Sequence, residues 1–591
     1  MKKNLLQKCF SLKSIKPIAA SHLRNIRDKI KKTQTIIVSY IIQLNNNLDS
    51  RLRFCIYFLS FLLLIVIIKI SSLTIKSLIV VPNKIKKTIY EREIRILDRN
   101  EKILVKNAFS YDFYFKPSEI LNPEEELDKA ISILPKIKQR REKILDKISE
   151  KKHIKNSFVL ASFNISEDEK LRLIEQGVIG VAFDEKKARY YIHSNLFSHL
   201  IGVCDSKGIG VSGIEKSIYD NIVEPNENNS VILSVDTEVQ RILHQELANL
   251  IESKKAIGAF GMIADVKNGE IIASASLPDF NPNTREGFEK NMFNKYTSGV
   301  YEFGSIFKLI NTALALKEGM SLTKVYSIPQ EFTIKSKTIT DMKHSRDSMT
   351  VEEIAMYSSN IGSAKIALDI GVKKQKEFFY ALGLGDKMQL EISETAKPLL
   401  PKQSQWKEVE SVTLSYGHGI AVTQAHMLRA FISLLNDGKF TNLTFLKNKS
   451  HEYETLNVTD KDVSKKLKKV MRNVVQFGAG KSVRSNFYNI GGKSGTAIKI
   501  DERGQYSRKK NILSFFAAFP IEKPKYAIII SLDEPSWEAA KSRFDVTGSR
   551  LGPNVKEIIE RLGYFSKIEK ISDIEKTAIE AEKTKFIKED L

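Results

Sequence analysis

The stretch Gly304–Leu314 reads GSIFKLINTAL, and it places a serine hydroxyl and a lysine amine three residues apart. The apolar residues that follow Lys308 predict a helix, in which side chains three positions apart share one face. If this helix begins at Ser305, the serine also lies at the positive end of the helix dipole. The geometry suits a serine nucleophile whose proton is taken by a lysine with a lowered pKa.

The pattern S-x-x-K alone is a weak signal, because the chain also contains it at Ser149–Lys152, Ser321–Lys324 and Ser507–Lys510. Among these copies, only the serine at 305 follows a glycine and precedes an apolar helix. We therefore interpret the other copies as chance matches on the solvent-exposed surface. Further motifs are needed to support a catalytic role for Ser305.

A second motif, Tyr357–Asn360 (YSSN), follows 53 residues after Ser305 (358 − 305). The Ser358 hydroxyl can relay a proton, and the Asn360 carboxamide can hold a substrate amide. Standing alone, the same residues would be read as a helix cap or a turn. Their position after the Ser–Lys pair favours the catalytic interpretation over a cap or a turn.

The third motif is Gly491–Thr496 (GGKSGT), a further 135 residues on (493 − 358). A strand of small residues lets a substrate backbone approach closely. Lys493 supplies a second cation, which helps to keep Lys308 neutral, and the Thr496 hydroxyl can bind a terminal carboxylate. In this order, the three motifs are the set of the penicillin-recognising serine enzymes.

The fold around these motifs is predicted from strands at both ends of the C-terminal region and long helical patterns between them. Such an order favours one antiparallel sheet backed by helices, an α+β domain. A hairpin is predicted at Lys267–Gly269. The predicted strands are Val231–Val235, Gly258–Val266, Glu270–Ala275, Leu513–Phe519 and Tyr526–Leu532, and the amphipathic helix before the hairpin is Glu238–Glu252.

The region before this domain is mixed and highly charged. Its helical stretches are Glu124–Lys151 and Asp168–Gln176, and short strands, Glu93–Leu97 and Lys102–Lys106, flank the turn at Asp98–Asn100. The residues after Leu562 are charged and lack a clear apolar face, so we expect a mobile tail.

An apolar run from Phe54 to Ile75, interrupted by Lys69, is long enough to cross a bilayer if that lysine snorkels to the interface. Some 50 residues rich in Lys and Arg precede it, and no small-residue cleavage site is evident. The positive-inside rule then places the N-terminus in the cytoplasm and everything after about residue 76 outside. A buried core helix is the alternative.

We attribute the net charge of +23 to solvent-exposed lysines, because the sequence shows no zinc-finger spacing and no RNA-stacking motif. We therefore expect no nucleic acid partner. The three cysteines, Cys9, Cys55 and Cys204, show no metal-binding or disulfide spacing. No metal and no cofactor are expected. His418 and His426 are interpreted as structural histidines.

From about residue 90 to 562, the chain resembles class B penicillin-binding proteins, most closely the septal FtsI-like transpeptidases of alphaproteobacteria. Beyond the three motifs, the stretches similar to the family are Ser198–Gly202, Gly208–Glu215, Ser276–Pro282, Ser415–Gly419 and Asp533–Pro535. The resemblance implies a cytoplasmic basic tail (1–52), a transmembrane helix (53–75), an elongated α/β pedestal, or dimerisation-like, domain (76–229), a transpeptidase domain (230–562) and a charged C-terminal tail (563–591).

The sequence departs from the family at a few positions. Phe303 stands where many relatives have Pro, and Ile306 and Ser494 stand where they have Thr. Around the Asp98–Asn100 turn, the family's Arg-Gly and Gly are replaced by Glu93-Ile94 and Glu101. The pedestal is therefore expected to differ locally.

What the resemblance implies is a serine-type D-Ala-D-Ala transpeptidase, without a glycosyltransferase domain, that cross-links peptidoglycan during cell division. Ser305 would form an acyl-enzyme with a stem peptide, and an amine of a neighbouring stem, such as meso-diaminopimelate, would take the acyl group. The implied roles are base for Lys308, proton shuttle and substrate contact for Ser358 and Asn360, carboxylate binding for Lys493, Ser494, Gly495 and Thr496, and an oxyanion hole at the backbone N–H groups of Ser305 and Thr496.

The resemblance further implies β-lactams as inhibitors, an inner-membrane location with a periplasmic catalytic domain, and an FtsW-like glycosyltransferase and divisome proteins as partners. The alternatives are an elongation-type paralogue, a membrane-bound serine β-lactamase or sensor of the same fold, and a scaffold with a vestigial site. A nucleotide-binding module is a further alternative, because Gly208-x-Gly210-x-x-Gly213 matches the dinucleotide fingerprint, with Asp236 about 20 residues later.

Overall fold

The computed structural model describes residues 49, 57–59, 61–67, 69, 93–341, 346–449, 456–500, 505–536 and 547–590. The chain divides into two compact units, Met1–Lys86 and Lys87–Leu591. In the first unit, residues 57–59, 61–67 and 69 are helical, with apolar side chains exposed. Most of the predicted tail (1–52) and transmembrane helix (53–75) lies outside the described residues. Within the described part of the chain, no helix combines the length and apolarity that a bilayer crossing requires.

The second unit begins with a five-stranded sheet, which we call the pedestal sheet. Its order is β3-β2-β1-β5, and β4 pairs with β2 on the other side. The pairing of β1 with β5 is parallel and the others are antiparallel. The strands are β1 (Arg95–Leu97), β2 (Ile103–Phe115), β3 (Val159–Ile165), β4 (Val181–Tyr191) and β5 (Ser230–Ile232).

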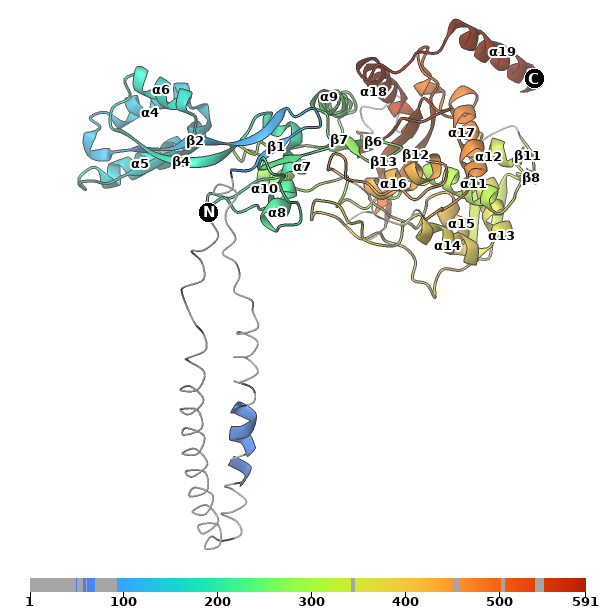
Figure 1. The fold of residues 1–591 in the computed structure, drawn as a ribbon, viewed down its shortest axis with the longest axis horizontal. Coiled ribbons are helices and arrows are strands. Elements are labelled where there is room, and N and C mark those ends of the chain that lie inside the picture. The colour runs from blue at the N-terminus through green and yellow to red at the C-terminus, as the bar shows by residue number, and fades with distance from the viewer. Residues whose placement is uncertain are drawn as a thin grey trace, which may run out of the picture. The chain divides into compact units, whose positions relative to one another are not determined.

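Three helices cover one end of the pedestal sheet: α4 (Pro123–Ile133), α5 (Arg141–Lys151) and α6 (Glu167–Glu175) (Figure 1). Their apolar sides pack on buried phenylalanines of β2. The single helix predicted over Glu124–Lys151 is two helices, because Pro135 lacks an amide hydrogen and disfavours helix in the residue before it. The short turn Pro135–Arg140 separates them.

Two glutamates have unusual backbone conformations near β1: Glu93 lies just before the strand, and Glu101 lies in the turn between β1 and β2. Glu93 and Glu101 both have left-handed backbones, with φ of 50° and 62°. A residue with a Cβ atom is disfavoured there by about 1–2 kcal/mol, whereas glycine is not. Both positions therefore have a conformation that suits glycine although glutamates occupy them.

A second sheet, the central sheet, forms the middle of the C-terminal domain. Its order is β12-β13-β14-β6-β7, antiparallel throughout. The α+β domain and the hairpin at Lys267–Gly269 are thus as predicted. The strands are β6 (Gly258–Asp265), β7 (Ile271–Leu277), β12 (Gly491–Ile500), β13 (Tyr506–Phe519) and β14 (Tyr526–Asp533).

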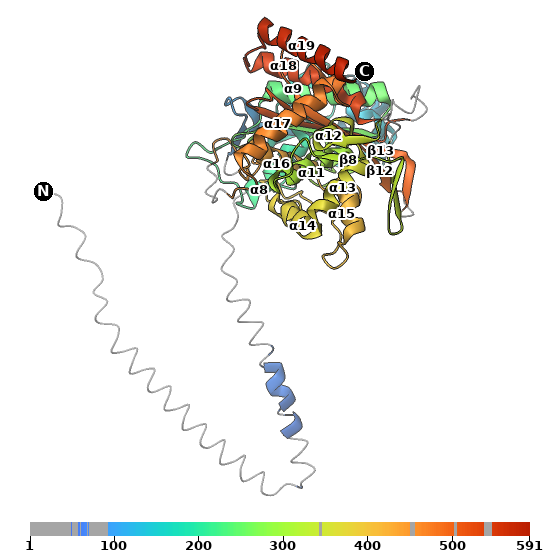
Figure 2. The ribbon, with the colours of Figure 1, turned by 90° about the vertical axis from the view of Figure 1, so that its right-hand side faces the viewer.

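Both faces of the central sheet are covered by helices. Along β14, Ile528 and Ile530 pack against α9 (Thr237–Lys254) and α18 (Gly552–Phe565) on one face (Figure 2). Their neighbour Ile529 joins the larger core on the other face. Every residue of β14 is buried, which explains its near-continuous apolar sequence.

The larger core is built from helices that lie between the two halves of the central sheet in sequence. The helices are α11 (Phe307–Lys317), α12 (Val351–Tyr357), α13 (Asn360–Ile370), α14 (Val372–Ala381), α15 (Glu408–Ser415), α16 (Gln424–Leu435) and α17 (Lys461–Gln476). Two small antiparallel pairs join β8 (Val325–Ser327) to β11 (Ser348–Thr350) and β9 (Glu331–Ile334) to β10 (Lys337–Thr340).

Buried polar contacts fix the base of the pedestal sheet, and one of them joins it to the C-terminal domain. Within the pedestal, Arg189 on β4 forms an ion pair of 2.8 Å with Glu215 on α8 (Gly213–Tyr219), and both side chains are almost fully buried. Thr237 donates its hydroxyl hydrogen to Asp98 at 2.6 Å. Two of the fingerprint glycines serve local packing: a Cβ atom on Gly210 would lie 2.2 Å from the Glu215 carbonyl oxygen, and one on Gly213 would lie 2.6 Å from the Gly202 backbone nitrogen. This use of the glycines argues against the nucleotide-binding alternative.

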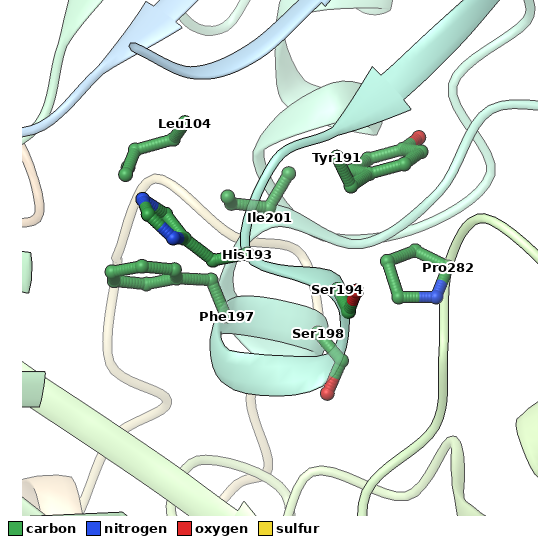
Figure 3. A pocket seen from close by; sticks show the side chains of 8 residues that line it. All are labelled: Leu104, Tyr191, His193, Ser194, Phe197, Ser198, Ile201 and Pro282. Carbon is green, nitrogen blue, oxygen red and sulfur yellow. The ribbon is translucent and has the colours of Figure 1, made fainter. Parts of the chain in front are cut away.

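A small pocket lies at this junction, beside α7 (Ser198–Ile201). Figure 3 shows Leu104, His193 and Phe197 on one side of it and Tyr191 and Pro282 on the other. Its volume is about 10 Å³, about the room that one water molecule needs. It is too small to hold a peptide or a nucleotide.

The residues expected to form a mobile C-terminal tail are instead largely helical. They form α19 (Asp573–Asp590), in which Ile579 is buried and Glu582 pairs with Arg472 on α17 at 2.9 Å. The sequence did not indicate this helix, because one buried isoleucine and an ion pair do not produce an apolar stripe.

We predict that Glu101→Gly stabilises the β1–β2 turn by about 0.5–1 kcal/mol, because it removes the left-handed strain at an exposed side chain. The measurement is hydrogen exchange of the turn amides, including the Asp98 amide that donates to the Lys102 carbonyl at 2.9 Å. Exchange should slow in this variant and not in Glu101→Ala, which keeps the Cβ atom. Equal exchange rates of the turn amides in the two variants would show that the left-handed backbone of Glu101 is not strained.

Candidate active site

The three sequence motifs meet in one cleft of about 560 Å³. Ser305 lies in a 3-10 turn, Gly304–Ile306, directly before α11. Ser358 is the left-handed residue that ends α12. Lys493 lies on β12, the edge strand of the central sheet. A helix, a turn and a strand far apart in sequence thus contribute to one site.

The Ser305–Lys308 pair has the geometry that the motif predicts. The Lys308 Nζ lies 2.9 Å from the Ser305 Oγ. The helix begins at Phe307 and not at Ser305, but the tight turn before it still places the two side chains on one side. The same Nζ lies 2.6 Å from the Ser358 carbonyl oxygen and 3.1 Å from its hydroxyl.

The Ser358 hydroxyl lies between two lysines. Lys493 approaches it at 3.0 Å, so one oxygen contacts the amines of both Lys308 and Lys493. Each lysine is only 1% exposed. Burial without a carboxylate in direct contact is unfavourable for an ammonium group.

This environment lowers the pKa of both lysines. The pKa of Lys308 falls well below its usual value, first because of burial and then because of the charge of Lys493, while Asp341 acts in the opposite direction. Burial lowers the pKa of Lys493 to about 7. The amine beside the Ser305 hydroxyl therefore loses its proton more readily than that of a solvent-exposed lysine.

Two glycines allow the motifs to approach each other. Gly304 has a φ of +52°, and a Cβ atom there would lie 2.4 Å from the Thr496 carbonyl oxygen. A Cβ atom on Gly495 would lie 2.1 Å from the Phe303 carbonyl oxygen. The absence of side chains at both positions lets β12 lie directly against the turn that carries Ser305.

Of the eight predicted site residues, Gly495 alone is not part of the cleft lining and lies in this backbone contact. Asn360 donates its side-chain amide hydrogen to the Thr340 carbonyl at 3.0 Å. The Thr496 hydroxyl accepts a hydrogen bond from the Gly548 amide at 2.9 Å. The residues that line the cleft are Ser305, Lys308, Ser358, Asn360, Lys493, Ser494 and Thr496.

Asp341 is a site residue that the sequence did not indicate. It follows β10, and its carboxylate accepts hydrogen bonds from the Ser359 hydroxyl and from the backbone amides of Asn360 and Ile361. It therefore fastens the start of α13, which carries the second motif. No local pattern marks it, because its partners lie some 20 residues further along the chain.

Glu302 and His418 also line the cleft. His418 was interpreted as a structural histidine, because a histidine between two glycines has no recognisable motif for chemistry. Its position in the cleft could be found only from the packing of its segment against Gly304.

Comparison with known proteins accords with this site. The family model described as the penicillin binding protein transpeptidase domain matches residues 259–550, and the one described as the penicillin-binding protein dimerisation domain matches residues 95–227. A probable peptidoglycan D,D-transpeptidase FtsI of Caulobacter vibrioides is 30% identical over 492 residues, which cover 81% of this chain and 82% of that protein. The chain belongs to the class B penicillin-binding proteins.

More distant relatives include peptidoglycan D,D-transpeptidases FtsI of Buchnera aphidicola and Escherichia coli. The first is 28% identical over 384 residues, covering 61% of this chain and 67% of that protein. The second is 25% identical over 381 residues, covering 60% and 64%. This class B penicillin-binding protein is a peptidoglycan D,D-transpeptidase of the serine type, as the sequence predicted, and membership implies peptide substrates and β-lactam binding.

We predict that Asp341→Ala slows acylation of this penicillin-binding protein by up to about 10²-fold, because the second motif would lose its anchor and shift. The rate of labelling by a fluorescent penicillin measures the effect. Asp347→Ala is the matched control, since Asp347 is an exposed acid six residues along the same segment. Equal labelling rates in the two variants would show that Asp341 does not position the motif.

Proposed function

We propose that Ser305 is the nucleophile of this transpeptidase and Lys308 its general base. The observation that supports the proposal is the 2.9 Å contact between the Ser305 hydroxyl and a buried amine whose pKa is strongly lowered. A neutral Lys308 takes the hydroxyl proton as the Ser305 oxygen attacks the carbonyl carbon of the D-alanyl-D-alanine bond. The terminal D-alanine leaves as an amine, and an ester to Ser305 remains.

The leaving amine needs a proton, and Ser358 is positioned to deliver it. Its hydroxyl lies 3.1 Å from Lys308, which holds the proton taken from Ser305. A proton that moves from Lys308 to the Ser358 oxygen, while the Ser358 hydrogen moves to the leaving nitrogen, balances the step. In the second half-reaction an amine of a neighbouring stem attacks the ester, and Ser305 recovers its hydrogen.

The remaining motif residues would hold the donor peptide. Lys493, with the hydroxyls of Ser494 and Thr496, forms a cationic and hydrogen-bonding end of the cleft that suits the terminal carboxylate. Asn360 would receive a substrate amide hydrogen on its side-chain oxygen. The backbone N–H groups of Ser305 and Thr496 would stabilise the oxyanion, and such a donor contributes about 10²–10³ in rate.

We further propose that the protein acts in cell division, as a single-pass inner-membrane protein with a cytoplasmic tail (1–52), a transmembrane helix (53–75), a pedestal (76–229), a periplasmic transpeptidase domain (230–562) and a C-terminal segment (563–591). The support is the apolar run, the preceding positive charge and the similarity to proteins named FtsI. An FtsW-like glycosyltransferase and divisome proteins are the proposed partners.

We predict that Ser305→Ala abolishes covalent labelling by fluorescent penicillin, and that Lys308→Arg does so too because arginine stays charged. Ser321→Ala is the matched control, because Ser321 begins another S-x-x-K pattern and is exposed. Mass spectrometry should place the label on the peptide that contains Ser305. Label on another serine would disprove the assignment, and rapid release of hydrolysed penicillin would indicate a β-lactamase.

We predict that a fluorescent fusion of the protein gathers at mid-cell in its native host and that its depletion gives filaments. A division enzyme is needed only at the septum, whereas an elongation-type paralogue would lie along the side wall. Fluorescence microscopy during depletion measures both features. Side-wall fluorescence with rounded cells would replace the division role by the elongation role.

A further inference from the structure

Two residues of the cleft lining, Glu302 and His418, and the adjoining Tyr506 have no part in the mechanism above. Glu302, three residues before the nucleophile, accepts hydrogen bonds from the Tyr506 hydroxyl at 2.8 Å and the Gly419 amide at 2.9 Å. Its other carboxylate oxygen lies 3.2 Å from the His418 Nδ1. We call Glu302, His418 and Tyr506 the glutamate–histidine cluster.

The cluster fixes the orientation of the imidazole ring. Glu302 holds Nδ1, and the Tyr506 ring lies against the His418 ring with centroids 4.7 Å apart and planes at 33°. A carboxylate on Nδ1 selects the tautomer in which Nε2 carries a free lone pair. Within the described residues Nε2 has no hydrogen-bond partner, and the His418 side chain is 35% exposed on the cleft lining.

The segment that carries His418 is held beside the reacting turn. A Cβ atom on Gly417 would lie 2.2 Å from the Gly304 carbonyl oxygen, so the two backbones touch. Tyr301 and Val422 exchange backbone hydrogen bonds of 2.9 and 3.0 Å, which fix the same two segments against each other. His418 is therefore adjacent to the turn that contains Ser305.

Transpeptidation needs a group near the ester that can accept a proton from the incoming amine. The acceptor amine arrives as an ammonium ion at neutral pH, because alkyl amines have a pKa of about 10. An ammonium ion cannot attack an ester, since its nitrogen has no lone pair. Lys493 repels a cation, whereas Glu302 attracts one, so the electrostatics favour entry of the acceptor on the side of the cluster.

We propose that the glutamate–histidine cluster is the acceptor subsite and that His418 receives the proton of the acceptor amine. This inference rests on the proposed acyl-enzyme at Ser305. Neutral His418 takes one proton from the ammonium ion on Nε2 and becomes an imidazolium that Glu302 faces. The free amine then attacks the ester carbon, its second proton passes through Ser358 and Lys308 to the Ser305 oxygen as the C–O bond breaks, and the imidazolium returns its proton to water.

The test separates the two halves of the reaction in the full-length protein in detergent. The donor is an N-benzoyl-D-alanyl thioester, which forms the acyl-enzyme without an acceptor, and the acceptor is a tripeptide ending in meso-diaminopimelate. The quantity measured is the ratio of aminolysis to hydrolysis of the acyl-enzyme. His418→Gln should leave acylation and penicillin labelling unchanged and lower this ratio by about 10²-fold, the usual loss for a missing proton acceptor.

Two further variants sharpen the outcome. Glu302→Gln should lower the same ratio, because a neutral amide no longer stabilises the positive charge of the His418 imidazolium. His153→Gln is the control, because His153 is an exposed histidine of the pedestal. An unchanged ratio in His418→Gln overturns the proposal. So does a loss of acylation parallel to the loss of aminolysis in both cluster variants, which would mark the cluster as structural. Failure of the wild type to acylate at Ser305 would instead refute the underlying mechanism.

Discussion

The placement of two buried lysine amines on one serine hydroxyl is the constraint on which the site depends. Two ammonium ions this close, with almost no exposure to water, would repel each other and lose their hydration. The arrangement becomes favourable when at least one amine is neutral. The fold therefore favours loss of a proton as well as a fixed geometry, and the amine that faces Ser305 has a pKa well below its usual value.

Holding these amines in place requires rigid elements from three parts of the chain. Lys308 lies on the apolar helix α11, whose other side is in the large core, and Lys493 lies on a strand of the central sheet. Ser358 ends α12 in a left-handed conformation, and Asp341 fastens the helix that follows. Because each element is anchored in the core, the site does not need a ligand to assemble it.

Much of this arrangement could be predicted from the sequence. The helix after Ser305 and the hairpin at Lys267–Gly269 were found because they depend on local periodicity and turn chemistry. Asp341 was missed because its hydrogen bonds join segments that are distant in sequence. The C-terminal helix was missed because one buried residue, Ile579, gives no periodic signal.

The glycine contacts around the nucleophile restrict how this protein can change under selection by antibiotics. Gly304, Gly417 and Gly495 each bring one backbone against another with no space for even a methyl group. A substitution there would force the backbones apart and move Ser305 away from Lys308. Positions where side chains, and not main chains, border the cleft have more freedom to change.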